Sequence, residues 1–147
     1  MKSITKILLL AVWALSFQPT FGQIENEQVA GFWMGTLDLG SMNMRLVFNI
    51  SVSSEDSFEA TMDSPDQGAK GISMGEVTVF GDSLRIEAPL LQGFYLGKFT
   101  SSTNIEGEWS QAGRDFALDL EKQAGAFVLN RPQEPKPPFP YKKEEVM

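Results

Sequence analysis

The chain has 147 residues, contains neither histidine nor cysteine, and carries a formal net charge of −7 at pH 7. Without these two residue types, Ser-His-Asp and Cys-His catalysis, disulfide bonds and the usual zinc sites are excluded. Because the net charge is negative, we do not expect the protein to bind nucleic acid.

The N-terminal segment has the features of a secretory signal peptide. Two lysines precede the apolar run Ile7–Leu15, which is shorter than the roughly 20 residues of a membrane-spanning helix. Thr20 and Gly22 supply small residues at the −3 and −1 positions of a cleavage site before Gln23. We therefore expect residues 1–22 to be removed, no membrane span to remain, and the mature protein to be exported.

Residues 23–28 are expected to be a short lead-in, and the segment 29–122 to be one domain. Its main pattern is an alternation of apolar and polar residues with a period of two, interrupted by Gly, Asp, Asn and Ser. Such alternation is typical of half-buried β-strands. In the clearest example, one face carries Met42, Met44, Leu46, Phe48, Ile50 and Val52.

The same pattern predicts seven further short strands. Their inward-facing or central residues are Trp33, Gly35, Leu37 and Leu39; Phe58, Ala60 and Met62; Ile72, Met74, Val77 and Val79, interrupted at Gly75; Leu84 and Ile86; Gly93 to Phe99; Ile105, Gly107 and Trp109; and Phe116, Leu118 and Leu120.

Eight short strands fit either a two-sheet sandwich or an up-and-down barrel. Nearly every connection has hairpin length, and no long Greek-key crossover is visible, so we predict an all-β, eight-stranded, lipocalin-like up-and-down barrel. A barrel of about eight strands is either filled by side chains or just wide enough for one small ligand. The sequence leaves both alternatives open.

Aromatic residues recur beside glycines in this domain, which makes Trp33, Tyr95 and Trp109 candidate ligand contacts. The competing interpretation is that glycines permit strand curvature while the neighbouring rings fill the core. This second interpretation is the one we favour.

A loop with two acids offers a second candidate site. Asp63 and Asp66 stand near Gly68, as carboxylates do in some calcium loops, but the spacing differs from that of an EF-hand. Local turn formation, with a positive φ at Gly68, explains the same residues and is favoured. Lys70 is then expected to pair with one of the acids at the surface. No metal or other cofactor is expected.

The segment Val77–Leu84 is similar to the nucleophile block of the GDSL esterases. That family activates its serine with a histidine, which this chain lacks. A hairpin turn at Gly81 and Asp82 explains the same residues, so we do not expect Ser83 to be a nucleophile. No Gly-x-Ser-x-Gly motif occurs either.

After residue 122 the alternation stops, and the segment 123–147 contains a proline-rich stretch, Arg131–Tyr141. Such a segment is expected to form an extended polyproline II linker. Phe139 and Tyr141 stand among the prolines and are candidate contacts with a neighbouring surface.

Three segments together resemble the N-terminal region of secreted α/β-hydrolases of Bacteroidetes-type bacteria, which are serine esterases or acyl-peptidase-like enzymes. These segments are Ala60–Ile72, Gly31–Leu37 and Arg131–Pro135. The resemblance implies an accessory β-domain and its linker, in the periplasm or outside a Gram-negative cell. In that family the stretch similar to Lys142–Val146 leads into the catalytic domain, whereas this sequence stops at Met147, so no catalytic residue is carried over.

Two functions follow from the sequence. In the first, the domain is a non-catalytic accessory domain that acts beside an α/β-hydrolase catalytic domain. In the second, it is a free-standing, lipocalin-like binder of a small apolar ligand. The resemblance favours the first.

Overall fold

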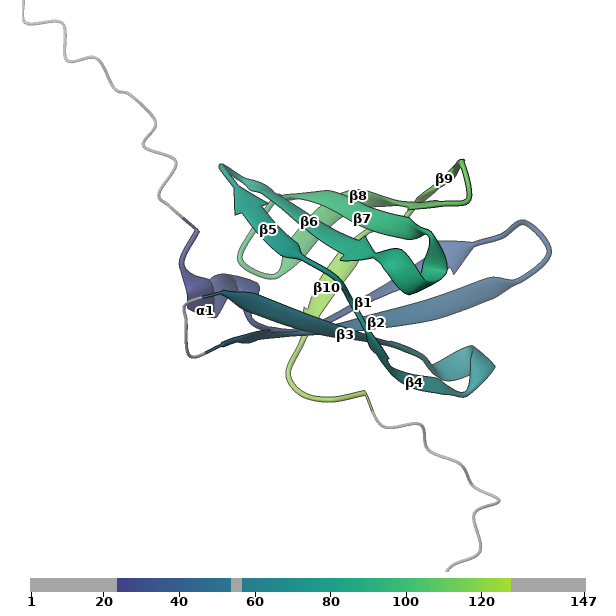
Figure 1. Ribbon diagram of the computed structural model, residues 1–147, viewed down its shortest axis with the longest axis horizontal. Helices are drawn as coiled ribbons and strands as arrows, with labels where there is room; N and C mark the ends of the chain where they lie inside the picture. Colours follow the sequence, from purple (N-terminus) through teal and green to yellow (C-terminus); the bar gives the residue numbers. More distant parts are fainter. Residues whose placement is uncertain (1–23, 54–56, 128–147) are drawn as a thin grey trace, which may run out of the picture.

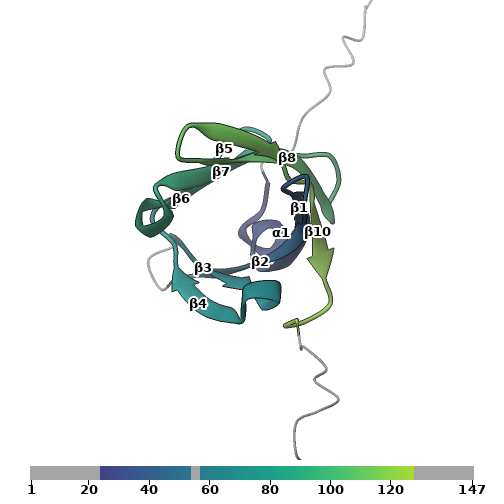
Figure 2. The ribbon, with the colours of Figure 1, turned by 90° about the vertical axis from the view of Figure 1, so that its right-hand side faces the viewer.

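The computed structural model describes residues 24–53 and 57–127. The expected signal peptide and proline-rich linker lie outside these ranges. The described residues form an all-β barrel, seen from the side in Figure 1 and end-on in Figure 2. Its strands are β1 (Gly31–Asp38), β2 (Asn43–Val52), β3 (Phe58–Ser64), β4 (Ala69–Ser73), β5 (Val77–Phe80), β6 (Ser83–Ala88), β7 (Gly93–Phe99), β8 (Asn104–Gln111), β9 (Arg114–Ala117) and β10 (Leu120–Gln123).

The strand pairs of the described residues are antiparallel, and consecutive strands pair along the meander from β1 to β9, except that β5 pairs with β3 and not with β4. The barrel closes where β10 pairs with β1, with Trp33 opposite Lys122. In two places, two consecutive short strands together take the position of one long strand. β4 and β5 both pair with β3, and β9 and β10 both pair with β8. The predicted eight-stranded up-and-down barrel is therefore confirmed, and the sandwich is wrong.

The interruption predicted at Gly75 is the point where a strand changes partner. The amide of Met74 donates to the carbonyl oxygen of Ala60 on β3 at 3.0 Å, whereas the amide of Gly75 donates to Glu87 on β6 at 2.7 Å. A Cβ atom at Gly75 would lie 2.9 Å from the Pro89 ring. The lack of a side chain therefore permits this close approach.

Large side chains fill the barrel. Trp33, Phe48, Tyr95 and Trp109 are fully buried, and the Phe48 ring centroid lies 5.6 Å from that of Tyr95 and 6.1 Å from that of Trp109. Rings at such distances pack favourably in tilted or edge-on arrangements. Of the two alternatives left open by the sequence, the filled interior is the one observed around these residues.

Three side chains predicted to face the core are exposed instead. Leu39 is 37 %, Met42 53 % and Val52 37 % exposed. Leu39 and Met42 belong to the turn between β1 and β2, where the amide of Leu39 bonds the carbonyl oxygen of Met42 at 3.0 Å. Val52 ends β2. The alternation continues in the sequence beyond the part of each strand that covers the core.

The expected lead-in contains a short helix that the alternation did not predict, α1 (Asn26–Val29). It lies at one end of the barrel, within the ring of strands in Figure 2. Val29 is fully buried, and the indole Nε1 of Trp33 donates a hydrogen bond to its carbonyl oxygen at 2.8 Å. We call this end of the barrel, with the β5–β6 turn and the β7–β8 loop, the α1 end.

The opposite end carries the β1–β2 and β8–β9 turns and two short 3₁₀ helices. These are η1 (Pro65–Gln67), between β3 and β4, and η2 (Pro89–Leu91), between β6 and β7. Each begins with proline, whose fixed φ suits the first helical position. Both connections are as compact as the hairpin turns, so they are consistent with a meander in which the chain runs up and down the barrel.

Candidate functional site

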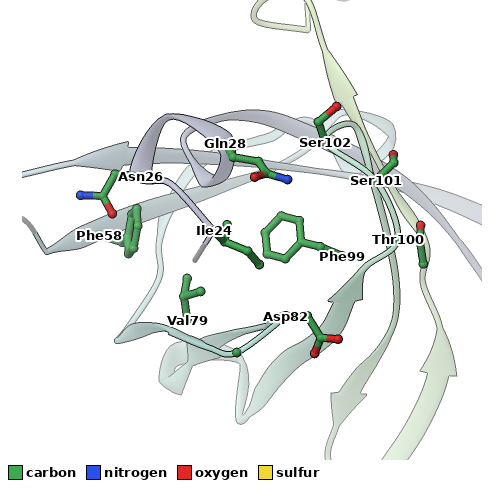
Figure 3. A pocket seen from close by; sticks show the side chains of 11 residues that line it. Ile24, Asn26, Gln28, Phe58, Val79, Asp82, Phe99, Thr100, Ser101 and Ser102 are labelled. Atoms are coloured by element: carbon green, nitrogen blue, oxygen red, sulfur yellow. The ribbon is translucent and has the colours of Figure 1, made fainter. Parts of the chain in front are cut away.

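A pocket of about 790 Å³ opens at the α1 end of the barrel. Its described wall comes from α1 and the segment before it, from β3, from the β5–β6 turn and from the β7–β8 loop. The lining residues are Ile24, Asn26, Gln28, Phe58, Val79, Gly81, Asp82, Phe99, Thr100, Ser101 and Ser102. Figure 3 shows that Ile24, Phe58, Val79 and Phe99 surround a common space.

The floor of this pocket is continuous with the barrel core. The Phe99 ring is largely buried and meets the Trp33 ring edge to face, with centroids 5.8 Å apart. Ile24, Phe58 and Val79 are partly buried and pack against the core. The apolar floor of the pocket is thus packed directly against buried side chains of the core.

The β7–β8 loop on the rim is held by its own hydrogen bonds. The carbonyl oxygen of Asn104 accepts from the amides of Thr100 at 3.0 Å and Ser101 at 3.3 Å. The hydroxyl of Ser101 donates to the side-chain oxygen of Asn104 at 3.0 Å. These bonds connect the two ends of the rim loop to each other.

One acid, Asp82, lies on the rim within the β5–β6 turn. Its carboxylate is 2.8 Å from the ammonium group of Lys98 and accepts a hydrogen bond from the Ser83 hydroxyl at 3.2 Å. The hydrogen bond from Lys98 lowers the pKa of Asp82 despite the opposing effect of desolvation. Asp82 is therefore ionised at neutral pH, and its negative charge is paired with Lys98 on β7.

The α1 wall is fixed by contacts from the far end of the sequence. The ammonium group of Lys122 on β10 donates to the carbonyl oxygens of Glu27 at 3.0 Å and Gln28 at 2.8 Å. Burial lowers the pKa of Lys122. Together with the Trp33 bond to Val29, these contacts attach α1 to the closing strands of the barrel.

The three aromatic residues proposed from the sequence as ligand contacts lie elsewhere. Trp33, Tyr95 and Trp109 are fully buried in the core, and none of them lines the pocket. The indole of Trp109 donates to the side chain of Gln111 at 3.1 Å, and Gln111 in turn donates to the carbonyl oxygen of Leu91 at 3.1 Å. These observations agree with the favoured interpretation, in which the rings fill the core.

The loop that contains Asp63 and Asp66 forms a compact connection, which we call the acidic corner, held together by hydrogen bonds of the two acids. Asp66 binds Arg45 on β2, accepting from its backbone amide at 2.8 Å and from its guanidinium group, whereas Asp63 accepts from the amide of Gly71 at 2.6 Å. Gly68 has the predicted positive φ, 68°. The described part of the chain has no group of three or more acids that could hold a metal ion. The pairing expected for Lys70 is not among the ion pairs of the described residues, in which Asp66 pairs with Arg45.

The segment similar to the GDSL block is a hairpin turn. Gly81 and Asp82 connect Phe80 to Ser83, which are paired across β5 and β6, and Gly81 has a φ of 60°. A positive φ at the first turn residue is what a two-residue hairpin of type II′ requires. The Ser83 hydroxyl bonds Asp82.

The sequence signal for the pocket was only partial. Phe58, Val79 and Phe99 were predicted as strand residues facing the interior, but nothing indicated that they lie where the barrel opens. Ile24 and Gln28 fall in the lead-in to which no structure was assigned, and Ser101 and Ser102 belong to a stretch that has the composition of an ordinary turn. Phe139 and Tyr141, the two candidates in the linker, lie outside the described residues.

Among residues 24–53 and 57–127 there is no helix long and apolar enough to cross a membrane. Comparison of the chain with protein-family models, with curated proteins and with solved structures gives no match.

Proposed function

We propose that this barrel is a non-catalytic accessory domain of a secreted α/β-hydrolase and acts by docking against the catalytic domain of that enzyme. The proposal is supported first by the resemblance of Gly31–Leu37, Ala60–Ile72 and Arg131–Pro135 to such enzymes. It is supported further by the closed barrel, whose outer surface offers a partner domain a rigid face to dock against.

The observation that carries the proposal is the filled interior. A lipocalin-like carrier needs an internal cavity, whereas here Trp33, Tyr95 and Trp109 occupy the centre of the barrel. A molecule that binds this domain must therefore do so on the outer surface or at an end. Docking of another domain requires only such a surface.

A lack of catalytic activity is part of the same proposal. Ser83 has no histidine to act as its base, because the chain contains none. Its hydroxyl lies beside Asp82, whose carboxylate already pairs with Lys98. We expect the purified chain to hydrolyse short acyl esters no faster than buffer does, and the Ser83→Ala variant to behave identically. Turnover that is lost in Ser83→Ala would contradict the proposal.

The proposal is tested by supplying the domain in trans. A secreted hydrolase of the resembled family is prepared with its N-terminal region deleted, and residues 23–147 of this chain, which contain the whole described barrel, are added. We expect a complex in analytical ultracentrifugation and recovery of thermal stability or esterase activity by the truncated enzyme.

A chain unfolded by the substitution Gly107→Ala, discussed below, is the matched control and should have no effect. If the folded barrel neither binds nor alters the truncated enzyme at concentrations up to about 100 μM, where even weak domain contacts register, the proposal is wrong.

A further inference from the structure

We infer that the pocket at the α1 end binds a small, uncharged molecule with an apolar aromatic or acyl body, and that it discriminates against anions of the same shape. This inference is independent of the proposed function, because it concerns a ligand in the pocket and requires no partner domain.

The size and the floor of the pocket fit such a ligand. Sites for small molecules occupy roughly 300–1,000 Å³ and are lined mainly by hydrophobic and aromatic side chains with a few polar groups; this pocket occupies about 790 Å³. Its floor is formed by Ile24, Phe58, Val79 and Phe99, whose side chains face one another in Figure 3. Burial of a ring or chain against them removes apolar surface from water.

The pocket is largely preformed. In its floor, the Phe99 ring packs against the buried Trp33 ring. The ends of the rim loop are joined by hydrogen bonds to Asn104, and the α1 wall is held by hydrogen bonds from Lys122. A wall that is already ordered loses little conformational freedom when a ligand binds, which favours affinity.

The charges around the pocket argue against an anionic ligand. No lysine or arginine is among its described lining residues, and the single charged one, Asp82, is an acid. The positive charge of Lys98 lies nearby, but it is already paired with the Asp82 carboxylate. The whole chain is also acidic, with a net charge of −7. A carboxylate or sulfonate in the pocket would lose hydration without gaining a cationic partner.

Hydrogen-bonding groups on the rim remain available. The side-chain amides of Asn26 and Gln28, on α1, have no hydrogen-bond partner among the described residues. Each can donate and accept. They suit a neutral polar group, such as an amide, ester or hydroxyl, at one end of the ligand.

The test uses two fluorescent probes with the same aromatic rings. N-phenyl-1-naphthylamine is neutral, and 8-anilinonaphthalene-1-sulfonate adds one sulfonate. With residues 23–147 we expect the neutral probe to bind one saturable site with micromolar affinity, and the sulfonate to bind at least about tenfold more weakly, which corresponds to about 1.4 kcal/mol. Amide shifts in a heteronuclear NMR spectrum should concentrate at residues 81–82 and 99–102.

Three variants locate and explain the binding. Val79→Gln places an amide on the apolar floor and should weaken the neutral probe about tenfold. Ser102→Arg adds a cation on the exposed rim loop and should strengthen the sulfonate several-fold in a salt-dependent way, while the neutral probe changes little. Leu90→Gln is the matched control, because Leu90 is 74 % exposed at the opposite end of the barrel.

The inference is overturned if the neutral probe fails to bind, if both probes bind equally, or if Leu90→Gln weakens binding as much as Val79→Gln does. If Val79→Gln does not fold, the Ser102→Arg variant still tests the inference. An unchanged affinity of that variant for the sulfonate probe would show that the probe binds outside this pocket. None of these outcomes depends on a hydrolase partner, so they are separate from the test in trans.

Discussion

The ammonium group of Lys122 donates a hydrogen bond to the main-chain carbonyl oxygen of Gln28 at 2.8 Å, across 94 positions of sequence. It also bonds Glu27 and lies 5.3 Å from the centre of the Trp33 ring. One side chain on the last strand thus fixes the helix that precedes the first strand. This contact makes α1 part of the folded domain and one wall of the pocket.

Replacement of Lys122 by methionine should therefore loosen α1 and lower the free energy of unfolding by about 1–2 kcal/mol, because hydrogen bonds from a charged donor contribute more than neutral ones. Methionine keeps most of the apolar stem of lysine. The measurements are urea denaturation and hydrogen exchange of the amides of residues 28–30. Lys70→Met is the control, since Lys70 is exposed and forms no ion pair in the described part of the chain; an equal loss in both variants would contradict the assignment.

The arrangement of strands was largely readable from the sequence, and the reason is physical. Burial against a filled core imposes a period of two on each strand, so residues such as Leu46, Phe48 and Ile50 identify their own face. The helix α1 could not be found in this way. It has only four residues, too few for a helical periodicity, and its place depends on Lys122, far away in the sequence.

The candidate site was harder to predict for a similar reason. An inward-facing residue in mid-barrel and one at an open end have the same local pattern, so Trp109 and Phe99 look alike in the sequence. Only the closed structure shows that Trp109 is in the centre and that Phe99 forms the floor of a pocket. The role of Asp66 was likewise hidden, because Arg45 lies 21 positions away on another strand.

The turn between β8 and β9 contains an alanine in a strained conformation. Ala112 has a φ of 51° and Gly113 a φ of 77°, and the two connect Gln111 to Arg114 in a two-residue hairpin. Positive φ at both positions is typical of a type I′ turn, which favours Asn-Gly or Gly-Gly. We expect Ala112→Asn to raise the free energy of unfolding by about 0.5–1 kcal/mol in urea denaturation. Gly113→Ala should lower it; a gain in stability from that control would show that the turn is not of this type.

Gly107 lies where two strands and a tyrosine ring meet. A Cβ atom there would be 2.5 Å from the Tyr95 hydroxyl and 2.6 Å from the main-chain oxygen of Leu96. The backbone oxygen cannot move away without breaking the pairing of β7 with β8, so Gly107→Ala should cost at least about 3 kcal/mol and prevent folding in a marginally stable domain. Gly125→Ala is the matched control, because nothing lies within 4 Å of its Cβ position. Near-ultraviolet circular dichroism compares the two variants, and a native spectrum for Gly107→Ala would contradict the packing described.

Lowering the pH should weaken the interaction between Arg45 and Asp66. Hydrogen bonds from the side chain and the backbone of Arg45 lower the pKa of Asp66 to about 2. Because this pKa is lower in the folded than in the unfolded chain, the stabilisation is fully present above about pH 4 and is lost as the pH falls toward 2. The difference in unfolding free energy between wild type and Asp66→Asn should therefore shrink over this interval. Arg45→Met should abolish the same pH dependence; a difference that stays constant down to pH 2 would contradict the pairing.

The hydroxyl of Tyr95 is buried and has no hydrogen-bond partner among the residues that the structure describes. Burial and the negative charge of Asp119 both raise the pKa of Tyr95, so the hydroxyl remains protonated. A buried polar group without a partner has lost its hydration and gained nothing in exchange. Tyr95→Phe keeps the ring and its packing against Phe48 but removes this cost. We expect the free energy of unfolding to stay unchanged or to rise by up to about 1 kcal/mol.

Tyr95→Leu provides the contrast, because it removes the hydroxyl together with the ring. The loss of aromatic packing and the cavity left behind should cost about 2–4 kcal/mol. Urea denaturation followed by tryptophan emission suits both variants, since Trp33 and Trp109 are buried and should emit at short wavelength only in the folded state. If Tyr95→Phe instead lost more than about 1 kcal/mol, the hydroxyl would be bonded, most simply to an internal water molecule. The centre of the barrel would then contain a polar contact rather than apolar packing alone.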